Sequence, residues 1–357
     1  MLETDSHPRV TDTRDDQGAV QARFSAALLD PVLASGIPGV AVAVATSMTT
    51  LVRTAGSTEA GGSRAIGPRH LFHIGSNTKS MTATLAGLAV DAGLLSWETT
   101  AGLVLGVDDA PGSAATLSQL LRHSAGILPL TTDDEVARRC VQVGDPGSRR
   151  AALADRLLRE GVLFPPGEGH EYSNGGYTIV AAMLEQVHGE SWETLLRRQV
   201  FAPAGMDALV GWPRDRSPRQ PAGHREESGR FEPHQLVDGY RLQPEIAPAG
   251  DASTTPRSYA RFLQAHLAAL AGRPAWLPIA VAKELHRPDA EGYACGWGVQ
   301  TFEGATTSVH AGSGGTFLCL AAIQPSRDIA VGIMANAAGE QTQVALVGLL
   351  HELLRAR

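Results

Sequence analysis

The sequence predicts a mixed α/β fold of the α+β type, in which an antiparallel sheet flanked by helices adjoins a helical lobe. Segments with strand character lie near both ends of the chain, at 39–54 and 293–336. Helical patterns fill much of the stretch between them. Turns that are rich in glycine or contain proline separate the late strands, as hairpins require. We therefore expect segments that are distant in the chain to build one sheet.

The first strand is predicted from an alternating apolar run. The segment GVAVAVAT, at 39–46, places valines on one face and alanines on the other. Because both faces are apolar, this strand is expected to be covered on both sides. A helix is expected before it, at about 19–33, and a turn after it leads to a second strand at 51–54.

The middle of the chain is predicted to be helical from caps, apolar spacing and stop signals. Thr116 and Gln119 form a capping-box pattern. Ser148 is expected to cap the segment RRAALADRLLRE, and Thr255-Pro256 to begin a later helix. Further helices are expected at 175–188, 191–200 and about 341–355.

These elements suggest a discontinuous organisation within a single catalytic unit. Residues 20–75 and 285–357 are expected to form the sheet lobe with its flanking helices, and 76–284 a mainly helical lobe. Residues 202–250 are rich in Pro, Arg, Glu and Gly, so we expect a long irregular segment there. Its Trp212 and Tyr240 are candidates either to line a pocket or to pack in the core. Ligand sites commonly lie between such lobes.

The bulk composition excludes some classes of partner. The 357 residues carry a formal net charge of −7, which argues against nucleic acid. No apolar run of about 18 residues occurs, so no membrane span is expected. The polar N-terminal segment lacks the features of a signal peptide, which favours a cytoplasmic location, or a periplasmic or secreted one if a leader was removed.

Lysine is almost absent from this chain, yet one lysine follows a serine by three residues. Of 30 lysines and arginines, only Lys79 and Lys283 are lysine. Gly75 precedes Ser76, and the apolar spacing after it predicts a helix whose first turn holds the serine. Ser76 and Lys79 would then lie on one helical face.

This pair has the chemistry of an activated nucleophile. A serine hydroxyl reacts well only when a base takes its proton. Arginine cannot be that base, because its pKa exceeds about 12, whereas a buried lysine can. The alternative is that Ser76 only caps the helix and Lys79 is solvated.

Two other segments carry groups that could serve Ser76. In FPPGEGHEYSNGGY, Tyr172 offers a phenol as a proton carrier, and Asn174 an amide that could orient a substrate or the lysine. In VHAGSGGTF, a strand passes His310, and the following glycines allow a ligand backbone to pair along its edge. The alternatives are a helix cap in the first segment and a glycine-rich turn in the second.

Together these segments resemble the three ordered elements of the serine β-lactamase and penicillin-binding protein superfamily. The elements are Ser-x-x-Lys at 76–79, Tyr-x-Asn at 172–174 and His-x-Gly at 310–312. Their order and spacing are similar to those of the class C β-lactamase-like branch, which holds β-lactamase-like esterases, D-alanyl-D-alanine carboxypeptidases and D-aminopeptidases. The flanking phrases LFHIGSNTKSMTA and LLRHSAGI agree. The resemblance implies a β-lactamase/transpeptidase-like fold.

The resemblance also implies a covalent mechanism with named roles. Ser76 would attack a carbonyl and become acylated, and water would release the acyl group. Lys79 and Tyr172 would share proton transfer, with either as the base. Asn174 would hold the substrate or Lys79. The remaining residues are assigned to substrate binding and the oxyanion hole: His310, Gly312 and Ser313, with backbone N–H groups of Ser76 and Ser313 as donors. No metal or organic cofactor is implied.

The implied substrate is a small-molecule ester, amide or β-lactam, with neither nucleic acid nor membrane as a partner. His310 stands where β-lactamases usually carry lysine, and a mostly neutral histidine would hold a carboxylate less firmly. We therefore expect a serine hydrolase of the esterase or D-amino-acid peptidase type. The alternatives are a true class C-type β-lactamase, a penicillin-binding module that acylates without turnover, and a non-catalytic scaffold.

Overall fold

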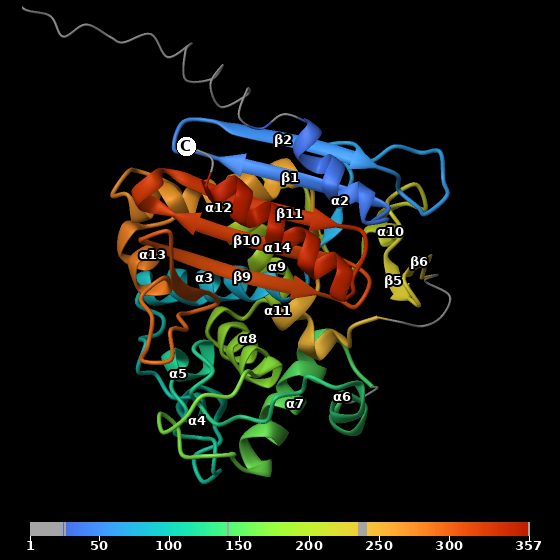
Figure 1. The fold of residues 1–357 in the computed structure, drawn as a ribbon. Helices are drawn as coiled ribbons and strands as arrows, with labels where there is room; N and C mark the ends of the chain where they lie inside the picture. The colour runs from blue at the N-terminus through green and yellow to red at the C-terminus, as the bar shows by residue number, and fades with distance from the viewer. Residues whose placement is uncertain (1–23, 25, 141–142, 235–240, 356–357) are drawn as a thin grey trace, which may run out of the picture.

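The largest sheet joins the two ends of the chain. The computed structural model describes residues 24, 26–140, 143–234 and 241–355. The strands of this sheet are β1 (Gly39–Ala45), β2 (Thr50–Gly56), β8 (Gly298–Phe302), β9 (Ala305–Ser313), β10 (Leu318–Gln324) and β11 (Ile329–Ala335). Within the described residues, each strand is antiparallel to its neighbours, and the order across the sheet is β2-β1-β11-β10-β9-β8 (Figure 1). Val40 pairs with Ala55 of β2 and with Ala335 of β11. The expected joining of distant segments is confirmed.

Both faces of β1 are covered, as its sequence predicts. The alanines at 41, 43 and 45 lie in a core shared with α12 (Pro256–Leu270), and the valines at 40, 42 and 44 in a core shared with α2 (Asp30–Ala34) and α14 (Glu340–Arg355). Figure 1 shows α14 crossing one face of the sheet. Apolar burial on two sides therefore holds this strand between two layers of helices.

The position of α12 corrects the expected division into lobes. This helix falls within the stretch 76–284, but it packs on β1 and β11 of the sheet. Its buried side includes Tyr259 and Phe262, and the absence of a side chain at Gly332 makes room for the Tyr259 ring. A Cβ there would lie 2.8 Å from that ring. The apolar stripe of α12 therefore needs the sheet to cover it.

The helical part of the molecule lies beyond β9 on the side away from β2 (Figure 1). Its central helix, α3 (Thr78–Asp91), is buried along most of its length and includes buried Lys79, Ser80 and Thr82. The surrounding helices are α4 (Ala101–Leu105), α5 (Leu117–Leu121), α6 (Asp133–Arg139), α7 (Pro146–Glu160), α8 (Asn174–His188), α9 (Trp192–Leu196) and α13 (Ile279–Leu285). No helix in the described ranges is both long and apolar enough to cross a membrane.

The predicted caps are partly right. Thr116 and Gln119 form the reciprocal capping box at the start of α5. The predicted cap of α7 is wrong, because this helix begins at Pro146 and its N-cap is Asp145, whose carboxylate accepts the N–H groups of Gly147 and Ser148. Proline fits the first helical position, and the aspartate before it satisfies the free donors.

The segment 202–250 is less irregular than its composition predicts. It contains β4 (Ala208–Val210), α10 (Pro213–Arg216), β5 (His224–Glu227), β6 (Arg230–Pro233), η5 (Pro244–Ile246) and α11 (Ala247–Gly250). The π-helical turn η3 (Arg197–Phe201) ends just before this segment. β4 pairs with β7 (Ala252–Thr254), which also pairs with β3 (Phe72–His73). Strands of only three or four residues leave little sequence periodicity, and β4 also depends on a distant partner.

Short 3-10 turns complete the fold: η1 (Ala26–Leu29), η2 (Gly75–Asn77) and η6 (Pro325–Arg327). The helix expected at 19–33 is divided between η1 and α2 where it is described. The part of that expectation at residues 19–23 and 25 lies outside the described residues, as does Tyr240. The turn η2 leads directly into α3 and carries Ser76.

Candidate active site

Ser76 lies half-buried in the turn η2, at the entrance to α3. Gly75 before it has a left-handed backbone (φ +52°), and a Cβ there would lie 2.4 Å from the Ser313 nitrogen. The side chain of Asn77 donates to the Cys319 carbonyl at 3.0 Å. Only glycine allows this turn to press so closely against β9. The helix start that the sequence predicts is confirmed, in 3-10 form.

The amine of Lys79 is buried and meets three neutral oxygens. Its Nζ lies 3.3 Å from Ser76 Oγ, 2.7 Å from Asn174 Oδ1 and 2.8 Å from the Ala249 carbonyl oxygen. Burial lowers the pKa of Lys79 well below its usual value. The alternative of a solvated lysine is therefore wrong, because the residue is 0% exposed.

Tyr172 brings a phenol to the same place from a segment almost a hundred residues away. The Ser76 side chain lies close enough to the phenol to lower its pKa. Lys79 Nζ lies 4.6 Å from the centroid of the Tyr172 ring. Burial raises the pKa of Tyr172 to about 12, although the nearby Ser76 side chain acts in the opposite direction. The phenol therefore keeps its proton near neutral pH.

The start of α8 fixes the orientation of Asn174. The Ser173 hydroxyl caps this helix by accepting the Gly176 N–H at 3.0 Å. The Asn174 side-chain nitrogen donates to the Leu130 carbonyl at 2.9 Å. With the nitrogen committed there, Oδ1 faces Lys79. The segment thus contains both the predicted cap and the predicted contact with the lysine.

The end of β9 lies directly against the turn that carries Ser76. A Cβ at Gly312 would lie 2.1 Å from the Ile74 carbonyl oxygen and 2.7 Å from the Ser76 nitrogen. Glycine is therefore needed for the strand to approach this closely. Gly75 makes the reciprocal contact with Ser313, so the backbone nitrogens of Ser76 and Ser313 lie on neighbouring segments. Ser313 itself is exposed.

His310 is neutral, and both of its ring nitrogens are engaged. Nδ1 lies 2.8 Å from the Ala311 carbonyl oxygen, which only accepts, so Nδ1 carries the proton. Nε2 then accepts the hydroxyl of Tyr293 at 3.1 Å. Burial first, and the nearby Lys79 second, lower the pKa of His310 to about 3. At neutral pH this ring offers no positive charge at the site.

Some groups at the site carried no recognised signal in the sequence. The Ala249 carbonyl is a backbone acceptor, which no side-chain pattern reveals. Tyr293 holds His310 from outside the strand. Asp251 contacts His73, with Asp251 Oδ1 3.1 Å from His73 Nε2. The one available signal was an aspartate among small residues in AGDAST.

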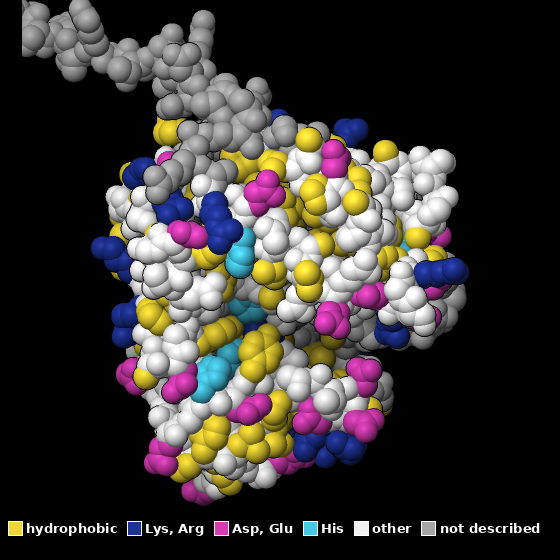
Figure 2. Space-filling view, viewed as in Figure 1, with side chains coloured by type: hydrophobic (Ala, Val, Ile, Leu, Met, Phe, Trp, Pro, Cys, Tyr) yellow, Lys and Arg dark blue, Asp and Glu magenta, His cyan; other side chains and the backbone are white. Residues whose placement is uncertain are grey.

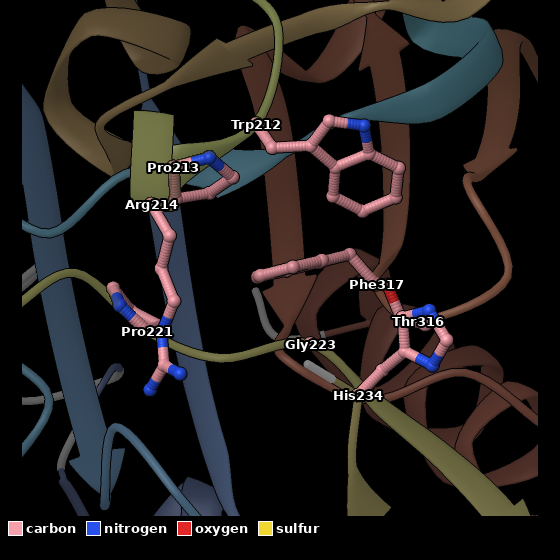
Figure 3. Close-up of a pocket in the computed structure, with 8 residues that line it drawn as sticks. All are labelled: Trp212, Pro213, Arg214, Pro221, Gly223, His234, Thr316 and Phe317. Carbon is pink, nitrogen blue, oxygen red and sulfur yellow. The ribbon is translucent and has the colours of Figure 1, made fainter. Parts of the chain in front are cut away.

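An apolar pocket lies next to the segment that follows β9 (Figure 3). Trp212, for which the sequence left a pocket or a core role open, lines this pocket together with Phe317 and Thr316 and is also buried in the core. The Trp212 ring also stacks on His73, with the centroids 4.2 Å apart. Among the described residues, no cluster of His, Cys, Asp or Glu side chains could hold a metal ion. Figure 2 shows histidine side chains reaching the surface in the hollow between the sheet and the helices.

Comparison with known proteins gives the relatives of this arrangement. A sequence model of the β-lactamase family matches residues 24–353. Penicillin-binding protein 4 of Amycolatopsis lactamdurans is 28% identical over 338 residues, which cover 89% of this chain and 85% of that protein. Unguisins hydrolase ungD' of Aspergillus campestris is 25% identical over 84% of this chain but only 58% of its own length. The crystal structure of SurE gives a TM-score of 0.78 at 26% identity, and the match covers 94% of this chain and 76% of SurE.

The family model extends over nearly all of the described residues, from the helices before β1 to α14. Both lobes that meet at Ser76 are thus included, together with the strands that the sequence places at the two ends. The chain therefore belongs to the β-lactamase family and is a serine hydrolase of β-lactamase-like type.

Proposed function

We propose that this chain hydrolyses ester or amide bonds through a covalent acyl-enzyme on Ser76, with Lys79 as the base. The observation that carries the proposal is the set of three contacts made by Lys79 Nζ. A neutral amine has two hydrogens and one lone pair. The oxygens of Asn174 and Ala249 accept the two hydrogens, so the lone pair is left to accept the Ser76 hydroxyl proton.

The pKa directions support Lys79 over Tyr172 as the base. Burial lowers the pKa of Lys79 and so increases its neutral fraction near pH 7. Burial raises the pKa of Tyr172 to about 12, which disfavours the phenolate. The phenol is better suited to pass a proton between Ser76 and the leaving group than to remove one.

The proton and electron changes then balance over two steps. Ser76 Oγ attacks the carbonyl carbon while its proton moves to Lys79 Nζ. The C–O or C–N bond to the leaving group breaks, and the leaving group takes that proton directly or through Tyr172. Water attacks the acyl ester in the same manner and restores Ser76. The N–H groups of Ser76 and Ser313 would stabilise the oxyanion in both steps, which typically contributes several kcal/mol.

The substrate is proposed to be neutral beside the scissile bond. A carboxylate in the substrate needs a cation or free N–H groups, and His310 offers neither at neutral pH. Relatives named as a hydrolase and as a penicillin-binding protein are compatible with an ester or amide substrate. We therefore infer a β-lactamase-like esterase, or a peptidase that does not require a free carboxylate.

The test uses native protein and Ser76→Ala with a matched set of probes. The probes are a p-nitrophenyl ester, a chromogenic cephalosporin, and a D-alanyl-D-alanine peptide with either a free or an amidated C-terminus. Intact-mass spectrometry and product release are measured for each. Native protein is expected to form the acyl adduct with the ester and to favour the amidated peptide. Equal turnover by Ser76→Ala would contradict the mechanism.

The same experiment separates the alternatives. Rapid hydrolysis of the cephalosporin, exceeding that of the ester, would assign a true β-lactamase. A cephalosporin adduct that releases over hours, with no ester turnover, would assign a penicillin-binding module. Neither outcome is expected, because His310 leaves the substrate carboxylate without a charged partner.

A further inference from the structure

The loop 123–130 begins within the phrase LLRHSAGI. Three of its backbone carbonyl oxygens accept hydrogen bonds from Ser173 and Asn174, but it supplies no predicted catalytic group. Its first residue, His123, is buried and has a left-handed backbone (φ +62°). Few residues other than glycine adopt this conformation, so its presence at a buried position calls for a local reason. The reason is visible in the partners of His123.

His123 hydrogen-bonds both chain neighbours of Tyr172. Its carbonyl oxygen accepts the Glu171 N–H at 2.9 Å. Its ring Nδ1 accepts the Ser173 N–H at 3.0 Å. Because Nδ1 accepts, the neutral ring carries its proton on Nε2. The residue that bears the phenol is thus held on either side by one histidine.

The ring of His123 also supports the phenol ring itself. The centroids of the His123 and Tyr172 rings are 4.4 Å apart, and Tyr293 packs on His123 at 4.7 Å. Nε2 is buried and has no hydrogen-bond partner in the described part of the chain. A buried, unpartnered N–H costs free energy, so hydrogen bonding by Nε2 does not account for a histidine here. The ring face and the Nδ1 acceptor are what account for a histidine at this position.

We propose that His123 is a positioning residue that holds the Tyr172 phenol against Ser76. The proposal rests on the role of Ser76 and Tyr172 in the proposed function. His123 does not touch the reacting atoms; it fixes the backbone at 171 and 173 and one face of the ring between them. Its burial, which with the nearby Lys79 keeps the pKa of His123 well below its usual value, suits a group that stays neutral during turnover.

Two substitutions separate the two contacts. His123→Asn keeps a side-chain acceptor for the Ser173 N–H and tolerates a left-handed backbone, but it removes the ring. His123→Phe keeps a ring face and removes the acceptor. Each is expected to lower kcat for the p-nitrophenyl ester about 10- to 100-fold, the cost of a small misplacement, with KM changed less than about 3-fold. If His123→Phe fails to fold, His123→Asn still tests the proposal.

A double-mutant cycle tests whether the effect passes through the phenol. In a Tyr172→Phe background, either His123 substitution is expected to cause less than about 2-fold further loss, because the hydroxyl to be positioned is gone. His224→Asn is the matched control. His224 is also buried and hydrogen-bonded, through Ala60 and Asn336, and its loss should affect stability equally in both backgrounds without changing kcat.

The outcomes are distinguishable. If the His123 variants behave like His224→Asn, or lose the same factor with and without the Tyr172 hydroxyl, the positioning role is wrong even though Ser76→Ala is inactive. If Ser76→Ala is active, the proposed function fails, and the role of His123 fails with it.

Discussion

His73 and Asp251 form a buried pair that joins the two segments on either side of Lys79. His73 Nε2 donates to Asp251 Oδ1 at 3.1 Å, and His73 Nδ1 accepts the Gly75 N–H at 3.3 Å. Asp251 directly follows α11, whose Ala249 carbonyl binds the lysine. One imidazole therefore connects the turn before the nucleophile to the segment that holds the base.

Removing the acceptor of this pair should harm both stability and turnover. Asp251→Ala leaves the His73 N–H buried without a partner, which costs about 1–3 kcal/mol. The substitution also removes the support that His73 gives to Gly75, next to the nucleophile. We therefore expect kcat to fall about 10-fold or more. Urea unfolding and ester kinetics measure the two effects. Asp251→Asn keeps an oxygen acceptor and should retain most of the stability; equal damage from Ala and Asn would contradict this account.

The pair also predicts a pH dependence of stability. Burial raises the pKa of Asp251, with the His73 hydrogen bond opposing it. A raised carboxyl pKa means that the folded state binds this proton more readily than the unfolded state. Its contribution is therefore present below the unfolded pKa of about 4 and is lost as pH rises through the folded pKa. The unfolding free energy of native protein relative to Asp251→Asn should fall from pH 3 to pH 7, and a rise would refute the assignment.

Lys79→Arg should be almost inactive although it keeps a basic side chain. A base must lose its proton, and the pKa of arginine exceeds about 12. We expect kcat/KM to fall at least about 1,000-fold, because loss of the base also disables the serine that it activates. Acylation by the p-nitrophenyl ester, followed by mass spectrometry, measures this. Lys283→Arg, on α13, is the control and should keep native activity. Activity retained in Lys79→Arg would move the role of base to Tyr172.

Gly312→Ala should separate β9 from the nucleophile turn. The added Cβ would lie 2.1 Å from the Ile74 carbonyl oxygen and 2.7 Å from the Ser76 nitrogen, so the backbones must move apart. Displacement of oxyanion donors costs about 100-fold in kcat. Gly298→Ala, on the adjacent β8, is the control, since its nearest contact would be 3.6 Å. Native-like kcat in Gly312→Ala would show that this approach is not needed for turnover.

Breaking the buried ion pair of Arg149 and Glu245 on one side should strongly destabilise the fold. Arg149 Nε and Nη2 each lie 2.9 Å from a Glu245 oxygen, and the carboxylate side chain is 0% exposed. Arg149→Met leaves the Glu245 carboxylate buried without a partner. The free energy of unfolding, measured in urea, is expected to fall by about 3–5 kcal/mol. Arg159→Met, whose partner Asp155 is solvent-exposed, should change little. Similar losses in both variants would contradict the distinction.

Local sequence patterns predicted the positions of many elements, because those elements depend on residues close in the chain. The alternation in 39–46 requires two covered faces, and the Thr116–Gln119 spacing closes a cap within one turn. The Ser148 cap was wrong because Asp145-Pro146 is a stronger local start signal three residues earlier. The low periodicity of 202–250 concealed β4, whose partner β7 lies some forty residues later.

The sequence by itself determined that Ser76 and Lys79 share one helical face, because three residues make nearly one turn. It also supplied Tyr172 and Asn174 as candidates by residue type. Only the tertiary structure decided that Lys79 is buried among neutral oxygens, that Tyr293 engages His310, and that His73 meets Asp251. Proton affinity and charge depend on surroundings contributed by distant segments, and these exist only once the chain is folded.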